Sequence, residues 1–251
     1  MERITSRKNP YVMRLRALAS DASLRRTSGE TVLDGVKLLG EALGAGAEVT
    51  GVLCTGGARL PEGLGCPVYE APPELVGYAS PVKNSPGPVF SVRMPAIAAP
   101  SGPENALVLE NMQDPGNVGT LIRTANALGI DAVILAGGCA DRTSPRAVRA
   151  SMGAAFRQYV RECSVEDLPD VMRGLGLTLY GAALSASARD LRTVDFTRAA
   201  VAIGNEGHGL SAEILDMCAG TVIIPMKPGS ESLNAAAAGA VAMWEMARRT
   251  L

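Results

Sequence analysis

The C-terminal part of the chain alternates between short apolar runs and segments whose apolar residues recur at helical spacing. The runs predict strands at Ala106–Leu109, Ala132–Leu135, Leu177–Gly181, Ala200–Ile203 and Thr221–Ile224. The spacings predict helices at Val118–Leu128, Pro145–Met152, Val165–Gly174 and Asn234–Arg249. Buried strands that alternate with helices form parallel sheets, because the connecting helices cover both faces. We therefore expect an α/β domain with a mostly parallel sheet.

The N-terminal part of the chain shows a smaller set of elements. The segment Asn9–Ala19 spaces Val12, Leu15 and Leu18 at helical intervals. A second helix is expected from Val36 to Leu43, with strands at Thr31–Leu33, Val49–Cys54, Pro67–Tyr69 and Val89–Arg93. Residues 80–102 are dense in Pro, Gly and Ser, a composition that breaks regular structure. We predict a small α/β domain over residues 1–95, a linker over 96–104 and the larger domain over 105–251.

Composition excludes several classes of protein. A hydrophobic content of 47% over 251 residues is ample for packed cores. The five cysteines form no CxxC pair and His208 is the one histidine, so a disulfide framework and a zinc site are both disfavoured. The first residues lack an apolar signal core, and the apolar run Ala235–Trp244 is too short to span a bilayer. We expect a cytoplasmic protein.

The net charge of −1 hides two basic runs. The first contains Arg3, Arg7, Lys8, Arg14, Arg16, Arg25 and Arg26. The second contains Arg142, Arg146, Arg149, Arg157 and Arg161. Each run is consistent with phosphate binding or with a solvated helix face. The candidate RNA-binding residues are Arg7, Lys8, Arg14, Arg16, Arg146 and Arg149.

Three strand ends carry unusual chemistry, and ligands of open α/β sheets bind at such ends. The first junction runs from Asn111 to Gly129, with Asn117 as a predicted N-cap and Gly129 as a C-cap. Arg123 lies off the apolar face of the predicted helix. A helix start beside an arginine suits a phosphate, whereas a capped helix with a solvated arginine explains the same spacing.

The second junction runs from Val201 to Ser211 and places three glycines directly after a strand. Glycines there let the backbone approach a ligand closely. Glu206 and His208 are candidate acids or bases, or they decorate an exposed turn.

The third junction, Ile223–Gly239, has an alanine-rich helix that begins at Ser232 or Asn234. An ordinary buried helix explains the alanines but not the polar Ser-Leu-Asn.

Taken together and in this order, the junctions resemble the three motifs of the SpoU/TrmH family of SPOUT methyltransferases. The matching pieces are Asn-Val-Gly-Thr-Leu-Ile-Arg-Thr-Ala from Asn117, Ile-Gly-Asn-Glu-Gly-His-Gly-Leu-Ser from Ile203, and Ile-Pro-Met with Ser-Leu-Asn-Ala-Ala from Ile224. The segments Ile4–Pro10 and Val32–Gly35 are similar to the substrate-binding domain, itself like a small ribosomal protein, of members that modify large-subunit ribosomal RNA. Asp34 stands where relatives often carry Glu.

The resemblance implies a trefoil-knotted domain that binds S-adenosylmethionine and methylates a ribose 2′-hydroxyl in RNA. The implied donor-binding residues are Leu184, Ile203, Gly204, Gly207, Ile224, Met226 and Leu233. The implied catalytic set is Arg123 with Asn117, Glu206, Ser232 and Asn234. The family is typically dimeric, with each active site made partly by the partner, and a small-residue last helix suits such an interface.

The implied reaction is an in-line attack of the 2′-oxygen on the sulfonium methyl, which requires no metal. Arginine at position 123 is an awkward base, because a guanidinium keeps its proton far above neutral pH. Either Arg123 loses a proton transiently after a phosphate rearranges its contacts, or it clamps that phosphate while another group accepts the proton. Histidine is the residue type best suited to accept that proton, which makes His208 a candidate, but the family resemblance does not support it.

Other functions fit less well. The chain lacks the G-x-G-x-x-G turn of dehydrogenases, the G-K-[ST] of P-loop enzymes and the G-x-S-x-G elbow of hydrolases. A non-catalytic RNA-binding protein on a methyltransferase scaffold and a transfer RNA methyltransferase remain alternatives. Large-subunit ribosomal RNA is favoured because of the added N-terminal domain. The sequence leaves open which nucleotide is methylated, and whether the modification serves housekeeping or antibiotic resistance.

Overall fold

The computed structural model describes residues 2–227, 229 and 232–248. The chain divides into two compact units. The first contains Met1–Ala96 and Asp141–Arg157, and the second contains Ile97–Ala140 and Gln158–Leu251. The segment Asp141–Arg157 lies in the chain between two strands of the second unit but packs with the first unit. The predicted domains are consecutive ranges and therefore do not include this grouping. Arg249, the predicted end of the last helix, lies outside the described residues.

The first unit is built on a mixed sheet with the strand order β1-β4-β3-β5-β2. Its strands are β1 (Glu2–Arg3), β2 (Glu30–Asp34), β3 (Val49–Cys54), β4 (Val68–Glu70) and β5 (Val89–Arg93). Its helices are α1 (Pro10–Ser20), α2 (Ala22–Ser28), α3 (Val36–Gly44), α4 (Pro73–Ala79), α6 (Pro145–Ala150) and the 3₁₀ turn η1 (Ala154–Phe156). The predicted stripe Val12, Leu15 and Leu18 of α1 is fully buried against Val32 and Leu53 of the sheet.

The segment Asp141–Arg157 is joined to the rest of the first unit by ion pairs. The buried Arg25 guanidinium lies 2.7 Å from the Asp141 carboxylate. Arg149 lies 3.2 Å from Asp34, and Arg157 lies 2.7 Å from Glu41. Arginines that the sequence offers as phosphate ligands therefore hold carboxylates of their own unit.

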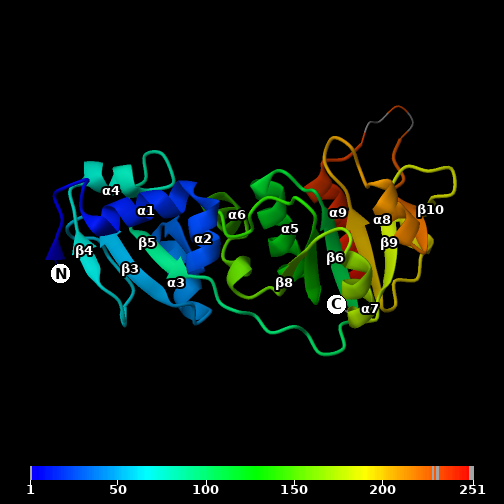
Figure 1. Ribbon diagram of the computed structural model, residues 1–251, viewed down its shortest axis with the longest axis horizontal. Helices are drawn as coiled ribbons and strands as arrows, with labels where there is room; N and C mark the ends of the chain where they lie inside the picture. The colour runs from blue at the N-terminus through cyan, green and yellow to red at the C-terminus, as the bar shows by residue number, and fades with distance from the viewer. Residues whose placement is uncertain (1, 228, 230–231, 249–251) are drawn as a thin grey trace. The chain divides into compact units, whose positions relative to one another are not determined.

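The second unit is built on a parallel sheet with the order β10-β12-β9-β11-β6-β7-β8. Its strands are β6 (Asn105–Glu110), β7 (Ala132–Ala136), β8 (Val160–Cys163), β9 (Thr178–Ala182), β10 (Arg189–Asp190), β11 (Ala199–Ile203) and β12 (Gly220–Ile223). Its helices are α5 (Pro115–Ala127), α7 (Leu168–Leu175), α8 (Ala212–Met217), α9 (Ala235–Ala247) and the 3₁₀ turn η2 (Leu191–Thr193). The predicted mostly parallel α/β sheet is confirmed (Figure 1).

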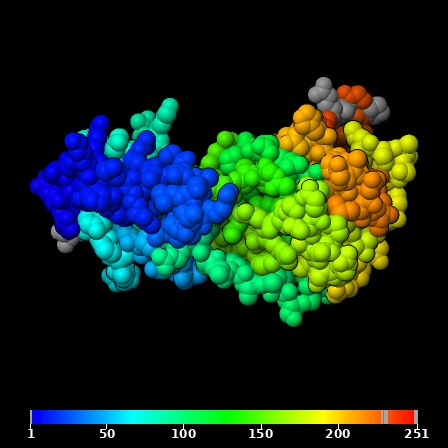
Figure 2. Space-filling view, in the orientation of Figure 1, coloured from blue at the N-terminus to red at the C-terminus, as the bar shows by residue number. Residues whose placement is uncertain are grey.

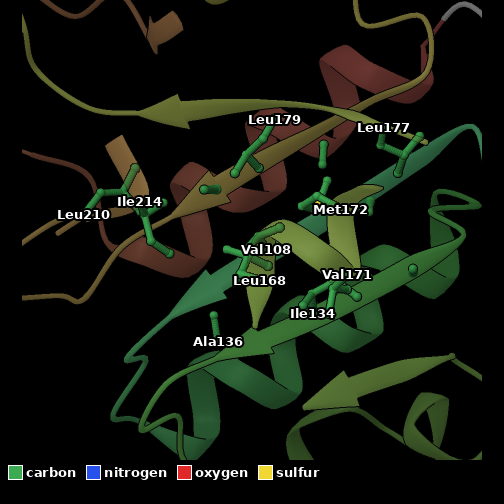
Figure 3. Packing of buried hydrophobic residues seen from close by; sticks show 14 residues of the cluster. Val108, Ile134, Ala136, Leu168, Val171, Met172, Leu177, Leu179, Leu210 and Ile214 are labelled. Atoms are coloured by element: carbon green, nitrogen blue, oxygen red, sulfur yellow. The ribbon is translucent and has the colours of Figure 1, made fainter. Parts of the chain in front are cut away.

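Both faces of this sheet are covered. On one face, Val108 and Ile134 of the strands meet Leu168 and Val171 of α7 and Ile214 of α8 (Figure 3). On the other face, α5 and α9 pack against each other and against the strands. The approach of these two helices is close, because a Cβ at Gly239 of α9 would overlap the Leu121 side chain of α5. Within the described residues, no helix combines the length and apolar character needed to cross a membrane.

Candidate active site

A pocket of about 460 Å³ lies at the carboxyl ends of β9, β11 and β12. Its walls come from the segments that follow these strands and from the start of α9. All seven residues of the predicted donor site line it, namely Leu184, Ile203, Gly204, Gly207, Ile224, Met226 and Leu233. His208 and Ser232 line it as well. The pocket is thus formed by the second and third junctions together, although residues 212–222 lie between them in the sequence.

The loop after β11 folds back on itself at the pocket wall. Asn205 and Gly209 exchange two backbone hydrogen bonds of 3.0 and 2.9 Å, and Gly209 has a φ of +71°. A Cβ at Gly204 would overlap the backbone of Gly209 and Leu210. Glycine is therefore required at position 204 for the loop to close, which gives this motif glycine a steric reason.

Asn205 fixes the inside of this loop. Its Oδ1 accepts hydrogen bonds from the amides of Gly207 at 2.8 Å and His208 at 3.2 Å. Its Nδ2 donates to the carbonyl oxygen of Asn111, after β6, at 2.8 Å. The far end of the loop is held by the buried Glu110, whose Oε2 accepts the Ser211 amide at 2.8 Å.

Glu206 links the loop to the start of α5. Its carboxylate accepts hydrogen bonds from Asn117 Nδ2 at 2.9 Å and from the amides of Gln113 and Asp114 at 3.3 and 3.4 Å. Partial burial raises the pKa of the Glu206 carboxyl, but these hydrogen bonds outweigh it and leave the pKa below its usual range. Glu206 is therefore an anion that orients its neighbours and a poor proton acceptor at neutral pH.

The start of α5 differs from the prediction. Asp114 is the N-cap, since its Oδ1 accepts the Gly116 amide, and Pro115 occupies the first helical position. The prediction that Asn117 caps the helix is wrong, because Asn117 lies inside the first turn. Its side-chain amide is thereby free to bind Glu206. Gly129 follows the helix with a φ of +68°, as expected for its end.

Arg123 is exposed on α5 and is not among the residues that line the pocket. Its guanidinium forms no hydrogen bond or ion pair with the part of the chain that the structure describes. Six residues separate it from Asn117, which turns the two side chains about 240° apart around the helix axis. The structure thus joins Asn117 to Glu206 but brings Arg123 to neither.

The polar residues of the third junction have distinct surroundings. Asn234 is the N-cap of α9, where its Oδ1 accepts the amides of Ala236 at 2.9 Å and Ala237 at 3.3 Å. Ser232 and Asn234 are both exposed, and Ser232 borders the pocket. Among the described residues, no group of three or more His, Cys, Asp or Glu side chains is placed to hold a metal ion.

The six candidate RNA-binding residues all belong to the first unit. Arg14 is paired with the buried Glu30 at 2.8 Å and Arg149 with Asp34. Arg7 and Arg16 lie against the ring of Tyr78. Lys8 and Arg146 are exposed.

Residues that the sequence analysis did not select also shape the site. Asn111, Asn205 and Glu110 hold the loop in place. Asn111 has a φ of +49° and accepts the Gly138 amide on Oδ1 at 2.7 Å. A polar residue directly after an apolar run was the available signal for Glu110 and Asn111.

Comparisons with known proteins agree with the geometry. Residues 104–244 match the model of the SpoU rRNA Methylase family. The 23S rRNA (guanosine(2553)-2'-O)-methyltransferase RlmP of Bacillus subtilis is 28% identical over 98% of this chain and 99% of its own. A 23S rRNA (uridine(2479)-2'-O)-methyltransferase of Streptomyces viridochromogenes is 32% identical over 99% and 93%. A crystal structure of an AdoMet-bound rRNA methyltransferase from Sinorhizobium meliloti has a TM-score of 0.87 and 28% identity, covering 100% of this chain and 98% of that one.

Proposed function

The chain belongs to the SpoU rRNA methylase family, and from this premise we propose that it transfers the methyl group of S-adenosylmethionine to a ribose 2′-oxygen of large-subunit ribosomal RNA. The observation that carries the proposal is the pocket after β9, β11 and β12, whose glycine-containing wall is tied through Glu206 to the helix that bears Arg123. The two named relatives act on a guanosine and on a uridine. The shared chemistry is therefore at the ribose, and the base is left open.

The pocket suits the donor in size and in chemistry. Ligand sites of this kind have volumes of about 300–1,000 Å³ and mostly apolar walls with a few polar groups. Leu184, Ile224, Met226 and Leu233 would contact the adenosine and the methionine chain, and the backbone at Gly204 and Gly207 would approach most closely. Bound there, the donor supplies an electrophilic methyl group on a sulfonium sulfur.

Arg123 serves the reaction by contacting the RNA phosphate next to the reacting ribose, where a bidentate guanidinium orients the 2′-hydroxyl. Asn117 and Glu206 position the start of α5. Ser232 borders the pocket, and Asn234 holds the start of α9 through the Ala236 amide. His208 lines the pocket, and an imidazole is the side chain most often used in enzymes to accept a proton. The proton acceptor is thus either His208 or a transiently neutral Arg123.

The active protein is a homodimer in which Arg123 completes the pocket of the partner subunit. This proposal accounts for an exposed Arg123 that does not line the pocket of its own chain. It also accounts for the C-terminal helix α9, where Val241 and Trp244 are 41% and 53% exposed one turn apart. We infer further that the second unit carries the trefoil knot of its family, with the donor held at the knot.

The first unit is the RNA substrate-binding domain, with a fold like that of a small ribosomal protein. The predicted limits of 1–95 for this domain, 96–104 for a linker and 105–251 for the methyltransferase domain stay our working division. The proposed RNA contacts are Arg7, Lys8, Arg14 and Arg16 of this domain and, from the segment Asp141–Arg157 that packs with it, Arg146 and Arg149. A cytoplasmic location fits an RNA substrate and five cysteines that are all free.

We expect label from methyl-labelled S-adenosylmethionine to enter large-subunit ribosomal RNA transcribed without modifications. The labelled position should resist alkaline cleavage, because a 2′-O-methyl group removes the attacking hydroxyl. Transfer RNA serves as the competing substrate. Label in transfer RNA alone would contradict the ribosomal assignment. Absence of both transfer and donor binding would favour a non-catalytic RNA-binding protein.

Replacement of Gly204 by alanine is expected to weaken S-adenosylmethionine binding at least about tenfold, because the new Cβ forces the loop open. Isothermal titration calorimetry measures the change. Gly174→Ala is the matched control, since a Cβ at this helical glycine meets no neighbour within 4 Å. Unchanged affinity in Gly204→Ala would contradict the role given to this wall of the pocket.

A further inference from the structure

The first unit exposes an aromatic ring that carries two arginines. Tyr78 lies near the end of α4 and is 37% exposed. The guanidinium carbon of Arg7 lies 4.5 Å from the ring centroid, and that of Arg16 lies 5.1 Å from it. Arg7 precedes α1 and Arg16 lies within it, and α1 packs beside α4 (Figure 1). We call these three side chains the Tyr78 surface.

The two arginines of the Tyr78 surface have no acidic partner within the described part of the chain. Neither Arg7 nor Arg16 forms an ion pair with an acidic residue among those that the structure describes. Arg16 donates one hydrogen bond, from Nη1 to the backbone carbonyl of Tyr78 at 3.3 Å. Glu74 lies one turn earlier on α4 and pairs with neither arginine. This differs from Arg14, Arg25, Arg93, Arg149 and Arg157 of the same unit, each of which holds a carboxylate.

Such an arrangement is poorly explained by stability. An exposed cation–π contact contributes about 0.5–1 kcal/mol, and two like charges beside one ring oppose each other. The ring does, however, fix the planes of both guanidiniums, so that less side-chain freedom is lost when they bind a ligand. Each guanidinium carries five N–H donors, and Arg16 uses one of them within the protein.

Apolar surface continues next to these cations. Met13 lies one turn before Arg16 on α1 and is 58% exposed, the second most exposed of the large hydrophobic side chains described. The segment that carries Arg7 and α1 forms a dark blue part of the molecular surface (Figure 2). Two oriented guanidiniums can donate hydrogen bonds to a phosphate, and the neighbouring thioether and ring offer apolar surface to a base. Together they suit a phosphate whose base is unstacked.

We propose that Arg7 and Arg16, oriented by Tyr78, clamp a phosphate of an unpaired nucleotide in the RNA substrate, with its base lying over the neighbouring apolar surface. The inference rests on the proposed function, because it assigns part of the RNA that the enzyme holds. An unpaired nucleotide is favoured over duplex RNA, since bases within a helix are stacked and cannot cover a side chain. Tyr78 acts as a positioning residue for the two arginines.

The test uses the full-length protein and two RNA probes of equal length, a mixed-sequence single strand and a blunt hairpin. Binding is measured by fluorescence anisotropy at several salt concentrations. We expect Arg7→Ala/Arg16→Ala to weaken single-strand binding about tenfold or more and to flatten the salt dependence by about one unit of slope. We expect Tyr78→Ala to weaken it severalfold without any change of charge, and Tyr78→Phe to restore it, since the ring is kept.

Arg59→Ala is the matched control for charge, because Arg59 is exposed in the same unit and contacts no aromatic ring there. The single variants Arg7→Ala and Arg16→Ala each remove one charge, as Arg59→Ala does, and a loss in both of them no larger than that in Arg59→Ala would overturn the clamp. The clamp would also be overturned if the arginine variants lost affinity equally for the hairpin and the single strand. It would be overturned as well if they lost affinity for polyglutamate, a polyanion that has no bases. Hydrogen exchange of the first unit confirms that each variant is folded.

Failure of this inference is distinguishable from failure of the proposed function. If the unaltered protein methylates ribosomal RNA and the double variant keeps the same KM for RNA, the clamp is wrong and the enzyme assignment stands. If the unaltered protein transfers no methyl group but the variants lose single-strand binding as expected, the enzyme assignment is wrong and the clamp stands. Donor affinity should be the same in all variants.

Discussion

Replacing Arg123 with alanine is expected to lower kcat for RNA methylation by about a hundredfold to ten-thousandfold, the range over which positioned proton-transfer groups act. The Kd for S-adenosylmethionine should not change, because Arg123 is proposed to contact the RNA phosphate and not the donor, and it does not line the pocket of its own chain. Single-turnover methyl transfer and calorimetry measure the two quantities separately. Arg123→Lys keeps the charge but not the bidentate geometry and should recover little of the loss. Near-normal activity in Arg123→Lys would contradict both accounts of the residue.

The proposed dimer makes a sharper form of this experiment possible. An Arg123→Ala chain keeps its donor pocket, and a Gly204→Ala chain keeps its arginine. If Arg123 serves the partner, a mixed dimer contains one intact site, whereas at a donor concentration well below the Kd of the Gly204→Ala pocket each variant alone is at least about tenfold less active. Random exchange of subunits should then restore about a quarter of normal activity, since half the dimers are mixed and each has one working site of two. No recovery from a confirmed mixed dimer would place Arg123 in its own subunit's site.

The arrangement of the second unit could be predicted because its physical signals are local. Apolar runs of strand length and helical periodicities are set by residues close together in sequence, and the five predicted strands of the larger sheet lie within about one residue of the observed bounds. Its two edge strands, β8 and β10, were not predicted. The edge strand β8 was missed because Arg161 and Glu162 are both exposed, so the run shows neither alternation nor continuous burial. The family resemblance, which rests on three motifs in order, is confirmed.

Side-chain partners could not be predicted in the same way. The sequence shows where cations cluster but not which carboxylates face them, since Arg149 and Asp34 lie 115 positions apart. For this reason Arg25, Arg149 and Arg157 looked available for phosphate although the structure pairs each of them. The Asn117 prediction failed for a local reason. Asp114 followed by Pro115 is the stronger helix start, and Asn117 then serves Glu206.

The buried pair of Arg25 and Asp141 leads to the largest expected effect on stability. The Arg25 side chain is 6% exposed, with Nε at 2.8 Å from Asp141 Oδ2 and Nη1 at 2.7 Å from the Leu18 carbonyl. Removing one partner of a buried pair costs about 3–5 kcal/mol, because the other charge is left unpaired. Asp141 is 23% exposed, so we expect Asp141→Ala to cost about 3 kcal/mol, near the lower limit.

Hydrogen exchange read by mass spectrometry is the suitable measurement, since it follows each unit separately in the full chain. Peptides from β2, α2 and residues 141–157 should exchange faster in Asp141→Ala, and those of the second unit should not. Asp170→Ala is the control, because its pair with Arg173 is about three-quarters exposed and contributes about 0–1 kcal/mol. If Asp141→Ala exchanges no faster than Asp170→Ala, the pair does not stabilise the first unit.

The same pair predicts how the first unit responds to acid. Burial raises the pKa of the Asp141 carboxyl, but hydrogen bonds from Thr143 and Arg25 outweigh it and hold the pKa below its usual range. Because the folded-state pKa is the lower one, the contribution of Asp141 is present above the unfolded pKa and is lost as pH falls through the folded pKa. The stability difference between the unaltered protein and Asp141→Ala should therefore be full at neutral pH and shrink below about pH 4.

The double variant Arg25→Met/Asp141→Leu, which leaves no charge unpaired, should be more stable than Asp141→Ala at neutral pH. A double variant less stable than Asp141→Ala would show that packing around the pair, and not its charge, carries the effect.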